Sequence, residues 1–313
     1  MKYKSILFRE LSGSLRPGKK AGLITGRQMF GKRQSIGKGT IAGYRMDPKQ
    51  RMQRLHYAIA CAKWSTLSDG DKEAYEAWAE ANDVTIFSSF LHSYLEELKT
   101  ALSLYMPMDA LINSEVTDYS QYANHGTNHN CVLQRNEFIA NCLKFDGSTA
   151  YVDCPDDPTL DTADELTTAL WFNKDQAQYG RLLYKYGSIA KRGYYIKCDL
   201  SNDNIKFVIF ANTSHVLQSV GTLPSTTWIH VAATRIDPWR MCIYLNGTLA
   251  SVPVASPSGT LANKGDLFIG QDYAGGNRFD GFLDEIRIYK KELTAEEIRA
   301  MYILESKWHG DMA

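Results

Sequence analysis

The spacing of apolar residues along the 313-residue chain changes twice, and this predicts three regions with different structures. Residues 1–45 have neither a helical nor a strand period, and glycine recurs there at positions 13, 18, 22, 26, 31, 37, 39 and 43. Glycine at that density loses more backbone entropy on folding than a short segment recovers by burying side chains. We therefore expect residues 1–45 to form a basic, extended arm.

Residues 46–104 have the period of amphipathic helices. Pro48 suits the first turn of a helix whose apolar face contains Leu55 and Ile59. Ser68 and Asp71 form a capping-box pattern that opens a second helix, and a third follows. The side chains expected in the core of this three-helix module are Trp64, Leu67, Tyr75, Trp78, Phe87 and Phe90.

From residue 105 the period changes to two, and short segments rich in β-branched and aromatic residues alternate with turn signals. Asn246-Gly247 suits a two-residue hairpin turn, and Thr294 with Glu297 caps a short closing helix. We expect an antiparallel β-sandwich over 105–305, with Trp171 between its two sheets, and a C-terminal tail over 306–313. The predicted fold class is therefore an α+β multidomain chain.

The zero net charge hides an asymmetry, because residues 1–54 contain 14 Lys and Arg but only two acidic residues. A basic arm on an acidic body indicates an anionic partner, either nucleic acid or an acidic protein surface. The candidate anchoring contacts are Arg27, Lys32, Arg33, Lys38 and Arg45.

The N-terminus lacks the apolar stretch of a signal peptide, and no apolar run approaches the ~20 residues that span a bilayer. We therefore expect a protein that is made in the cytoplasm and has no membrane partner. The six cysteines show no CxxC spacing, which favours free, buried thiols.

Several strings in 105–305 occur in an order typical of one family. They are Thr117-Asp-Tyr-Ser, Asn124-His-Gly, Leu143-Lys-Phe-Asp-Gly-Ser, Ala169-Leu-Trp-Phe, Trp228-Ile-His-Val-Ala-Ala-Thr, Tyr244-Leu-Asn-Gly, Leu267-Phe-Ile-Gly and Phe279-Asp-Gly-Phe-Leu-Asp-Glu-Ile-Arg-Ile-Tyr. This region resembles the concanavalin A-like laminin-G domains. The resemblance implies a jelly roll that binds or stabilises rather than catalyses.

Members of that fold often hold one structural Ca²⁺, and the resemblance makes Asp118 and Asp284 the candidate ligands, with carbonyl help from residues 124–126. The alternative is that Asp118 makes a turn bond and Asp284 pairs with a backbone amide or Arg287. No cofactor is required by either interpretation.

Aromatic residues in or beside the predicted loops 173–193, 211–226 and 271–279 could stack on sugars, or be partly buried instead. These candidates are Tyr179, Tyr184, Trp239 and Tyr273. The chain lacks Gly-x-Ser-x-Gly, P-loop and His-Glu-x-x-His motifs, and Asp280-Gly-Phe-Leu-Asp-Glu lacks the spacing of a glycan-hydrolysing Glu-x-Asp-x-x-Glu. We therefore do not expect an enzyme.

The helical region is similar to two kinds of module. The segment 63–79 resembles part of an HMG box, a DNA-bending domain, and its layout also resembles small N-terminal modules of tailed-phage structural proteins. The second resemblance also accounts for the arm and the sandwich. It predicts a bacteriophage virion protein, a capsid or tail decoration, anchored through residues 1–104 to capsid or tail proteins. It would be a homo-oligomer whose sandwich decorates the surface or attaches to host glycans. The alternatives are a DNA-binding protein and a cellular carbohydrate-binding lectin.

Overall fold

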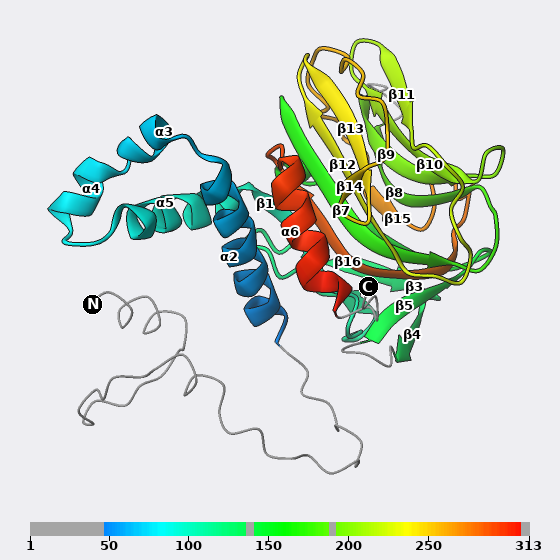
Figure 1. Cartoon of the computed structure of the whole chain (residues 1–313). Coiled ribbons are helices and arrows are strands. Elements are labelled where there is room, and N and C mark those ends of the chain that lie inside the picture. Colours follow the sequence, from blue (N-terminus) through cyan, green and yellow to red (C-terminus); the bar gives the residue numbers. More distant parts are fainter. Residues whose placement is uncertain (1–46, 136–140, 188–191, 308–313) are drawn as a thin grey trace, which may run out of the picture. The chain divides into compact units, whose positions relative to one another are not determined.

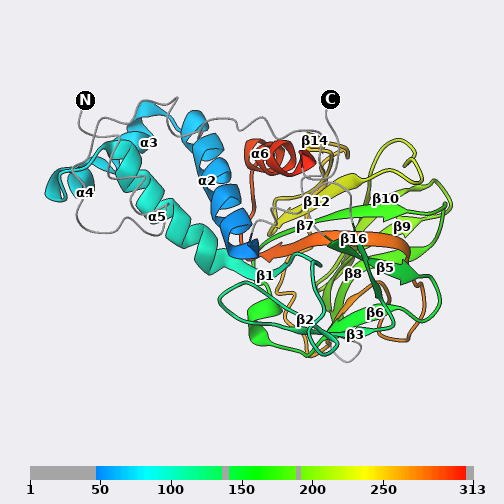
Figure 2. The same cartoon turned by 90° about the horizontal axis from the view of Figure 1, so that it is seen from below.

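The computed structural model describes residues 47–135, 141–187 and 192–307 (Figures 1 and 2). The predicted arm over 1–45, with all five anchoring residues, lies outside these ranges and stays a prediction. The described residues fall into two compact units: residues 67–92 form one, and residues 47–66 with 93–307 form the other.

Four helices precede the sandwich: α2 (Pro48–Thr66), α3 (Asp69–Glu73), α4 (Glu76–Ala81) and α5 (Ile86–Ala101). The first begins at Pro48, and Ser68 with Asp71 forms the predicted capping box at the start of α3. The segment expected as one second helix is instead two short ones, α3 and α4.

The smaller unit, residues 67–92, has an aromatic centre. The ring of Tyr75 meets Phe90 edge-on with 5.3 Å between ring centroids, and Phe87 stacks beside Phe90 at 6.5 Å. The prediction that Trp78 is a core residue is wrong. Trp78 is 43% exposed and stacks on His92, because the six-residue helix α4 buries only Ala79.

The strands in the described ranges form two antiparallel sheets of eight strands each, which confirms the predicted fold class. The first sheet has the order β14-β13-β12-β7-β16-β5-β4, with β1 also paired to β16. The second has the order β11-β10-β9-β8-β15-β6-β3-β2. The strand bounds are β1 (Leu102–Met106), β2 (Glu115–Val116), β3 (Gly126–His129), β4 (Val132–Arg135), β5 (Asn141–Asp146), β6 (Tyr151–Cys154), β7 (Glu165–Lys174), β8 (Gly180–Gly187), β9 (Arg192–Asp199), β10 (Asn204–Phe210), β11 (Ser214–Gln218), β12 (Ile229–Ile236), β13 (Arg240–Leu245), β14 (Thr248–Leu249), β15 (Leu267–Ile269) and β16 (Asp280–Tyr289). A 3₁₀ turn, η1 (Pro158–Leu160), follows β6, and α6 (Ala295–Ser306) follows β16.

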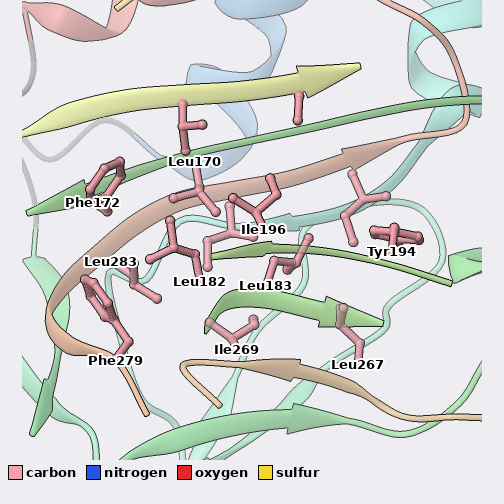
Figure 3. Packing of buried hydrophobic residues seen from close by; sticks show 14 of the residues in the cluster. Leu170, Phe172, Leu182, Leu183, Tyr194, Ile196, Leu267, Ile269, Phe279 and Leu283 are labelled. Atoms are coloured by element: carbon pink, nitrogen blue, oxygen red, sulfur yellow. The ribbon is translucent and has the colours of Figure 1, made fainter. Parts of the chain in front are cut away.

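The hydrophobic core lies between the two sheets, where alternate residues of each strand point inward (Figure 3). Leu170 and Phe172 enter it from β7, and Tyr194 and Ile196 enter it from β9. The predicted turn at Asn246-Gly247 is confirmed, since both residues have positive φ, 48° and 69°. Of the six free cysteines, five are buried in the sandwich.

Helices α2 and α6 cover the outer face of the first sheet, as Figure 2 shows. Trp171 points to this outer face, so its predicted place between the sheets is wrong. Its ring stacks on Tyr302 of α6 at 5.8 Å, and its Nε1–H donates to Glu305 at 2.8 Å. The reason is the strand period: because its neighbours Leu170 and Phe172 point into the core, Trp171 must point away from it.

Charged side chains are buried where the two helices meet the sheet. Arg51 of α2 pairs with Asp109 and Glu285, and Arg287 of β16 pairs with Glu285 and, at 2.7 Å, with Glu305 of α6. Arg287, Glu285 and Glu305 are 0% exposed, and Arg51 is 2% exposed. Opposite charges therefore hold α2, α6 and β16 together without water.

Replacing Arg51 by methionine is expected to destabilise the sandwich by about 3–5 kcal/mol, because Glu285 and Asp109 then stay buried without their shared cation. Urea unfolding followed by circular dichroism measures the change. The matched control is Lys49→Met on the exposed side of the same helix, which we expect to alter the free energy of unfolding by less than about 0.5 kcal/mol. Equal effects of the two variants would contradict the role given to the buried pairs.

The buried His56 makes stability depend on pH. Burial and the nearby positive charge of Arg287 lower the pKa of His56 to about 3, and its Nε2 lies 3.2 Å from the Tyr289 hydroxyl. Between the folded pKa and the unfolded value of about 6.5, only the unfolded chain takes up the proton. The stabilisation is thus complete above the unfolded pKa and is lost as the pH falls towards the folded pKa.

When the pH falls from 7 to 5, protonation of His56 in the unfolded chain should lower the free energy of unfolding by about 2 kcal/mol. A His56→Gln variant should not show this contribution. Denaturant unfolding of both proteins at the two pH values measures this difference. Parallel losses of stability in the two proteins would show that His56 stays accessible to protons.

Candidate functional site

The two sheets differ in what covers their outer faces. Helices α2 and α6 close the first sheet, whereas no described α-helix of the same compact unit covers the second (Figure 1). Aromatic and basic side chains occupy the outer face of the second sheet instead. This face is therefore the candidate functional site.

Five aromatic rings form one contiguous cluster on this face, which we call the aromatic platform. Its members are Tyr184 and Tyr186 of β8, Tyr195 of β9, Phe210 of β10, and Tyr273 from the loop between β15 and β16. Tyr184 is at the centre, with centroid distances of 5.4 Å to Tyr195, 5.9 Å to Tyr186 and 6.2 Å to Tyr273. Phe210 joins the cluster through Tyr186 at 4.8 Å and Tyr195 at 6.0 Å.

Strand register brings these rings together. Tyr184 and Tyr186 are two residues apart on β8 and so share a face, and Tyr195 is the direct partner of Tyr184 on β9. Gly193 is the cross-strand partner of both Tyr186 and Phe210. It has φ +134°, and a Cβ atom there would lie 2.0 Å from the Lys185 carbonyl oxygen. Only glycine fits at this position, and its missing side chain leaves room for the two rings to meet.

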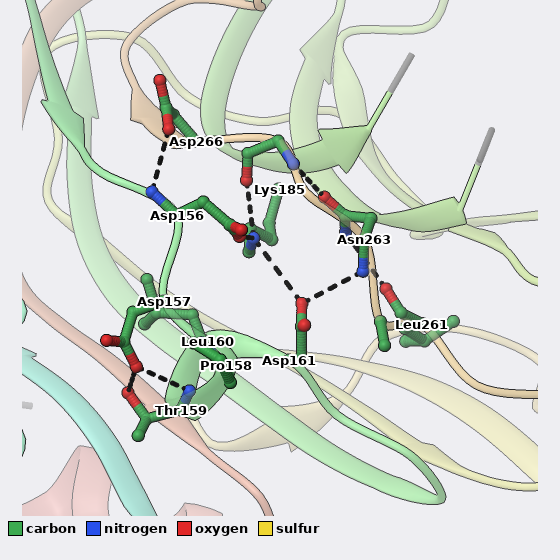
Figure 4. A network of polar contacts seen from close by, with 12 residues as sticks. Asp156, Asp157, Pro158, Thr159, Leu160, Asp161, Lys185, Leu261, Asn263 and Asp266 are labelled. Atoms are coloured by element: carbon green, nitrogen blue, oxygen red, sulfur yellow. Dashed lines mark hydrogen bonds and ion pairs between the residues drawn. The ribbon is translucent and has the colours of Figure 1, made fainter. Parts of the chain in front are cut away.

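Lys185 fixes β8 from the side opposite the platform. It lies between Tyr184 and Tyr186 in sequence, so its side chain points to the other face, where it is fully buried. Its Nζ donates to Asp156 at 2.6 Å and to the Gly265 carbonyl at 2.5 Å (Figure 4). The strand that carries the two tyrosines is therefore held by charge-assisted bonds to two separate loops.

Cations lie over several of these rings. The guanidinium carbon of Arg181 is 4.0 Å from the centroid of Tyr195 and 5.5 Å from that of Tyr184, and Lys197 Nζ is 5.3 Å from that of Tyr179. Burial raises the pKa of Tyr184, an effect that Arg181 only partly opposes. The central hydroxyl therefore stays neutral at physiological pH. The platform as a whole is apolar in its rings and positive around them.

The four aromatic residues proposed from the sequence have different surroundings. Tyr184 and Tyr273 stack within the platform, and Tyr179 lies under Lys197 on the same face. Trp239 is 75% exposed in the turn between β12 and β13 of the first sheet, apart from the platform rings. The predicted loop 173–193 contains strand β8 (Gly180–Gly187), whose register shift between Arg181 and Leu183 interrupts the alternation and puts both Leu182 and Leu183 in the core.

Sequence reasoning missed Arg181, Tyr195 and Phe210. Tyr195 and Phe210 lie on β9 and β10, and the alternation of inward and outward positions along these strands is the signal that could have found them. Tyr194 and Ile196 point inward, which requires Tyr195 to point outward.

The two candidate calcium ligands have other contacts. The Asp118 carboxylate accepts bonds from the backbone N–H groups of Tyr105, Ser120 and Asn124, at 2.7–2.8 Å, and from the Ser120 hydroxyl at 2.6 Å. Asp284 Oδ1 accepts a bond from the Glu285 N–H at 2.9 Å. Calcium binding at these residues stays a prediction. Within the described ranges, no group of three or more His, Cys, Asp or Glu side chains is arranged to hold a metal ion.

The two packed antiparallel sheets have the architecture of a jelly-roll β-sandwich. Residues 146–299 match the family model described as the concanavalin A-like lectin/glucanases superfamily. No curated protein matches the sequence. Among the helices described, none is long and apolar enough to cross a membrane.

Several solved structures share the fold. The binding domain of Paraclostridial Mosquitocidal Protein 1 superposes with a TM-score of 0.55 at 12% identity, over 66% of this chain and 52% of that one. Domain 4 of AbnA, an extracellular arabinanase from Geobacillus stearothermophilus solved with arabinotriose, gives 0.51 at 16% identity, over 64% and 98%. A structure of botulinum neurotoxin type C gives 0.53 at 14% identity, over 67% and 52%. The present chain thus spans about half the length of the two toxin structures, and these identities establish similarity of fold alone.

Proposed function

We propose that the sandwich binds carbohydrate through the aromatic platform. The observation that carries this proposal is the contiguous group of five rings on a sheet face that no described helix of its unit covers. Aromatic rings offer a large, rigid apolar surface at low entropic cost, and this suits the C–H face of a sugar ring. Polar groups at the edge of the platform can then bond to sugar hydroxyls.

Two of the structures that share this fold support the proposal. The Geobacillus domain was solved in complex with arabinotriose, and cell entry of botulinum neurotoxin type C depends on interaction with two ganglioside molecules. A non-enzymatic binding role also agrees with the absence of hydrolase motifs noted in the sequence. The ligand of this chain is proposed from its own platform rather than from those proteins.

Removing the exposed ring of Tyr273 should weaken glycan binding at least tenfold, because this residue is 55% exposed and forms the outer edge of the platform. A glycan array probed with the full chain, followed by titration of the best ligand into Tyr273→Ala, measures the effect. Trp239→Ala is the matched control, since Trp239 is an even more exposed aromatic residue on the other sheet. Loss of binding in the Trp239 variant alone would place the site elsewhere and overturn the assignment to the platform.

We further propose that residues 1–104 anchor the chain in a larger assembly, in the first place a bacteriophage virion, as a homo-oligomer on the capsid or tail. Support comes from the 14 basic and two acidic residues within 1–54 and from the similarity of the helical region to phage structural modules. An arm of this composition has the charge to bind an acidic partner surface. The sandwich would then face outward and attach to host glycans.

Neutralising the arm tests the anchoring role. A variant with Arg27, Lys32, Arg33, Lys38 and Arg45 all changed to glutamine should be absent from purified virions while its glycan binding is unchanged. Immunogold labelling of particles with antibody to the sandwich measures incorporation. If the unmodified chain binds duplex DNA with a steep salt dependence and is absent from particles, the DNA-binding alternative is correct instead.

A further inference from the structure

Two arginines on the outer face of the second sheet lack an anionic partner. Arg181 lies over Tyr195 and Tyr184, and Arg278 lies over Tyr151 of β6 at 5.2 Å. The Arg181 backbone N–H donates to the carbonyl of Asn277, the residue before Arg278, so the two arginines belong to adjoining segments. In the described part of the chain, no carboxylate lies within ion-pair distance of either guanidinium.

Several guanidinium N–H groups of Arg181 and Arg278 make no hydrogen bond. Nε and Nη1 of Arg181 are fully covered and have no hydrogen-bond acceptor, and the same holds for Nη1 of Arg278. Arg278 uses Nε alone, in a bond to the Gly275 carbonyl at 3.1 Å. A guanidinium cannot lose its proton at physiological pH, so both charges persist. Covered donors without acceptors are costly, and an anion bound at the uncovered Nη2 would stabilise the positive charge of the same guanidinium.

Carboxylates near the platform are already occupied. Asp199 accepts bonds from both Lys197 and Lys206, each at 2.9 Å. Asp272 accepts bonds from the N–H groups of its own loop and from the Asn277 side chain at 2.7 Å. Neither carboxylate pairs with Arg181 or Arg278, and the single charge of Asp199 is shared by Lys197 and Lys206. The face therefore has an excess of positive charge directly beside its aromatic rings.

Resting on the proposed carbohydrate-binding function, we propose that the ligand is an acidic sugar, with Arg181 and Arg278 recognising its carboxylate or sulfate group while the platform rings stack on the sugar. Nη2 of each guanidinium, which is neither covered nor hydrogen-bonded, can donate a charge-assisted hydrogen bond to either kind of anion. Nη2 of Arg181 is accessible, so the ligand reaches the group from that side. The stacking of Arg181 on Tyr195 holds the fork in place before the ligand arrives.

The experiment compares sialyllactose, sulfated lactose and lactose by calorimetric titration into the full chain at low and high salt. At least one acidic form should bind about tenfold or more tightly than lactose, with a preference that weakens as salt rises. Comparison of sialyllactose with sulfated lactose shows whether the recognised group is a carboxylate or a sulfate. Equal affinities for all three sugars would overturn the inference and leave the proposed function intact, whereas an array without any bound glycan overturns both.

Substitution of single arginines tests which residues cause the preference for the acidic sugar. Arg181→Gln and, independently, Arg278→Gln should reduce the ratio of acidic-sugar affinity to lactose affinity about tenfold. Arg240→Gln is the matched control, because it removes an arginine charge on β13 of the first sheet, where Arg240 pairs with Glu292 at 2.8 Å. Thermal unfolding establishes that each variant is folded. If both platform variants keep the preference, or if Arg240→Gln loses it, the assignment to these arginines is wrong.

Discussion

The architecture depends on the ion pairs buried between β16 and the helices α2 and α6. Glu285 lies at the centre of this cluster, where it contacts Arg51, Arg287 and the Tyr105 hydroxyl. It has φ +52° at a bulge in the pairing of β16 with β7, which turns its side chain toward the helices. Such a cluster is stable only when every charge has its partner, because each ion has lost its water. It therefore selects one arrangement of α2 and α6 on the sheet.

This constraint gives the two outer faces of the sandwich different roles. The first sheet uses Trp171 and the buried charges to bind its own helices, so the part of its face under α2 and α6 is closed to a ligand. The second sheet has no such helices in its unit, and its outward positions are aromatic and basic. Because the helices occupy the outer face of the first sheet, the outer face of the second sheet is the surface that can bind a large, partly apolar ligand.

The sequence determines strands, turns and caps through local chemistry, and these could be predicted. The Asn246-Gly247 turn and the capping boxes at Ser68 and Thr294 depend on residues near in sequence. Alternation fixes which residues of a strand share a face, but which of the two faces lies against the other sheet could not be decided without knowing what covers each sheet. Trp171 has the size and apolarity of an inter-sheet residue, yet it belongs to the opposite face because Leu170 and Phe172 occupy the core. Arg181 was missed for the same reason, since its importance comes from rings that are distant in sequence.

The platform combines a rigid part with a variable part, and this division bears on how its specificity can arise. Tyr184, Tyr186 and Tyr195 are on paired strands, and β8 is held from behind by Lys185. Tyr273 and Arg278, in contrast, come from the loop between β15 and β16, whose conformation is held by Asp272. Rings fixed on strands lose little entropy when a sugar stacks on them, so they provide affinity for sugars in general. The loop can change in sequence without disturbing the sheet, so the choice among sugars is made where Tyr273 and Arg278 approach the fixed rings.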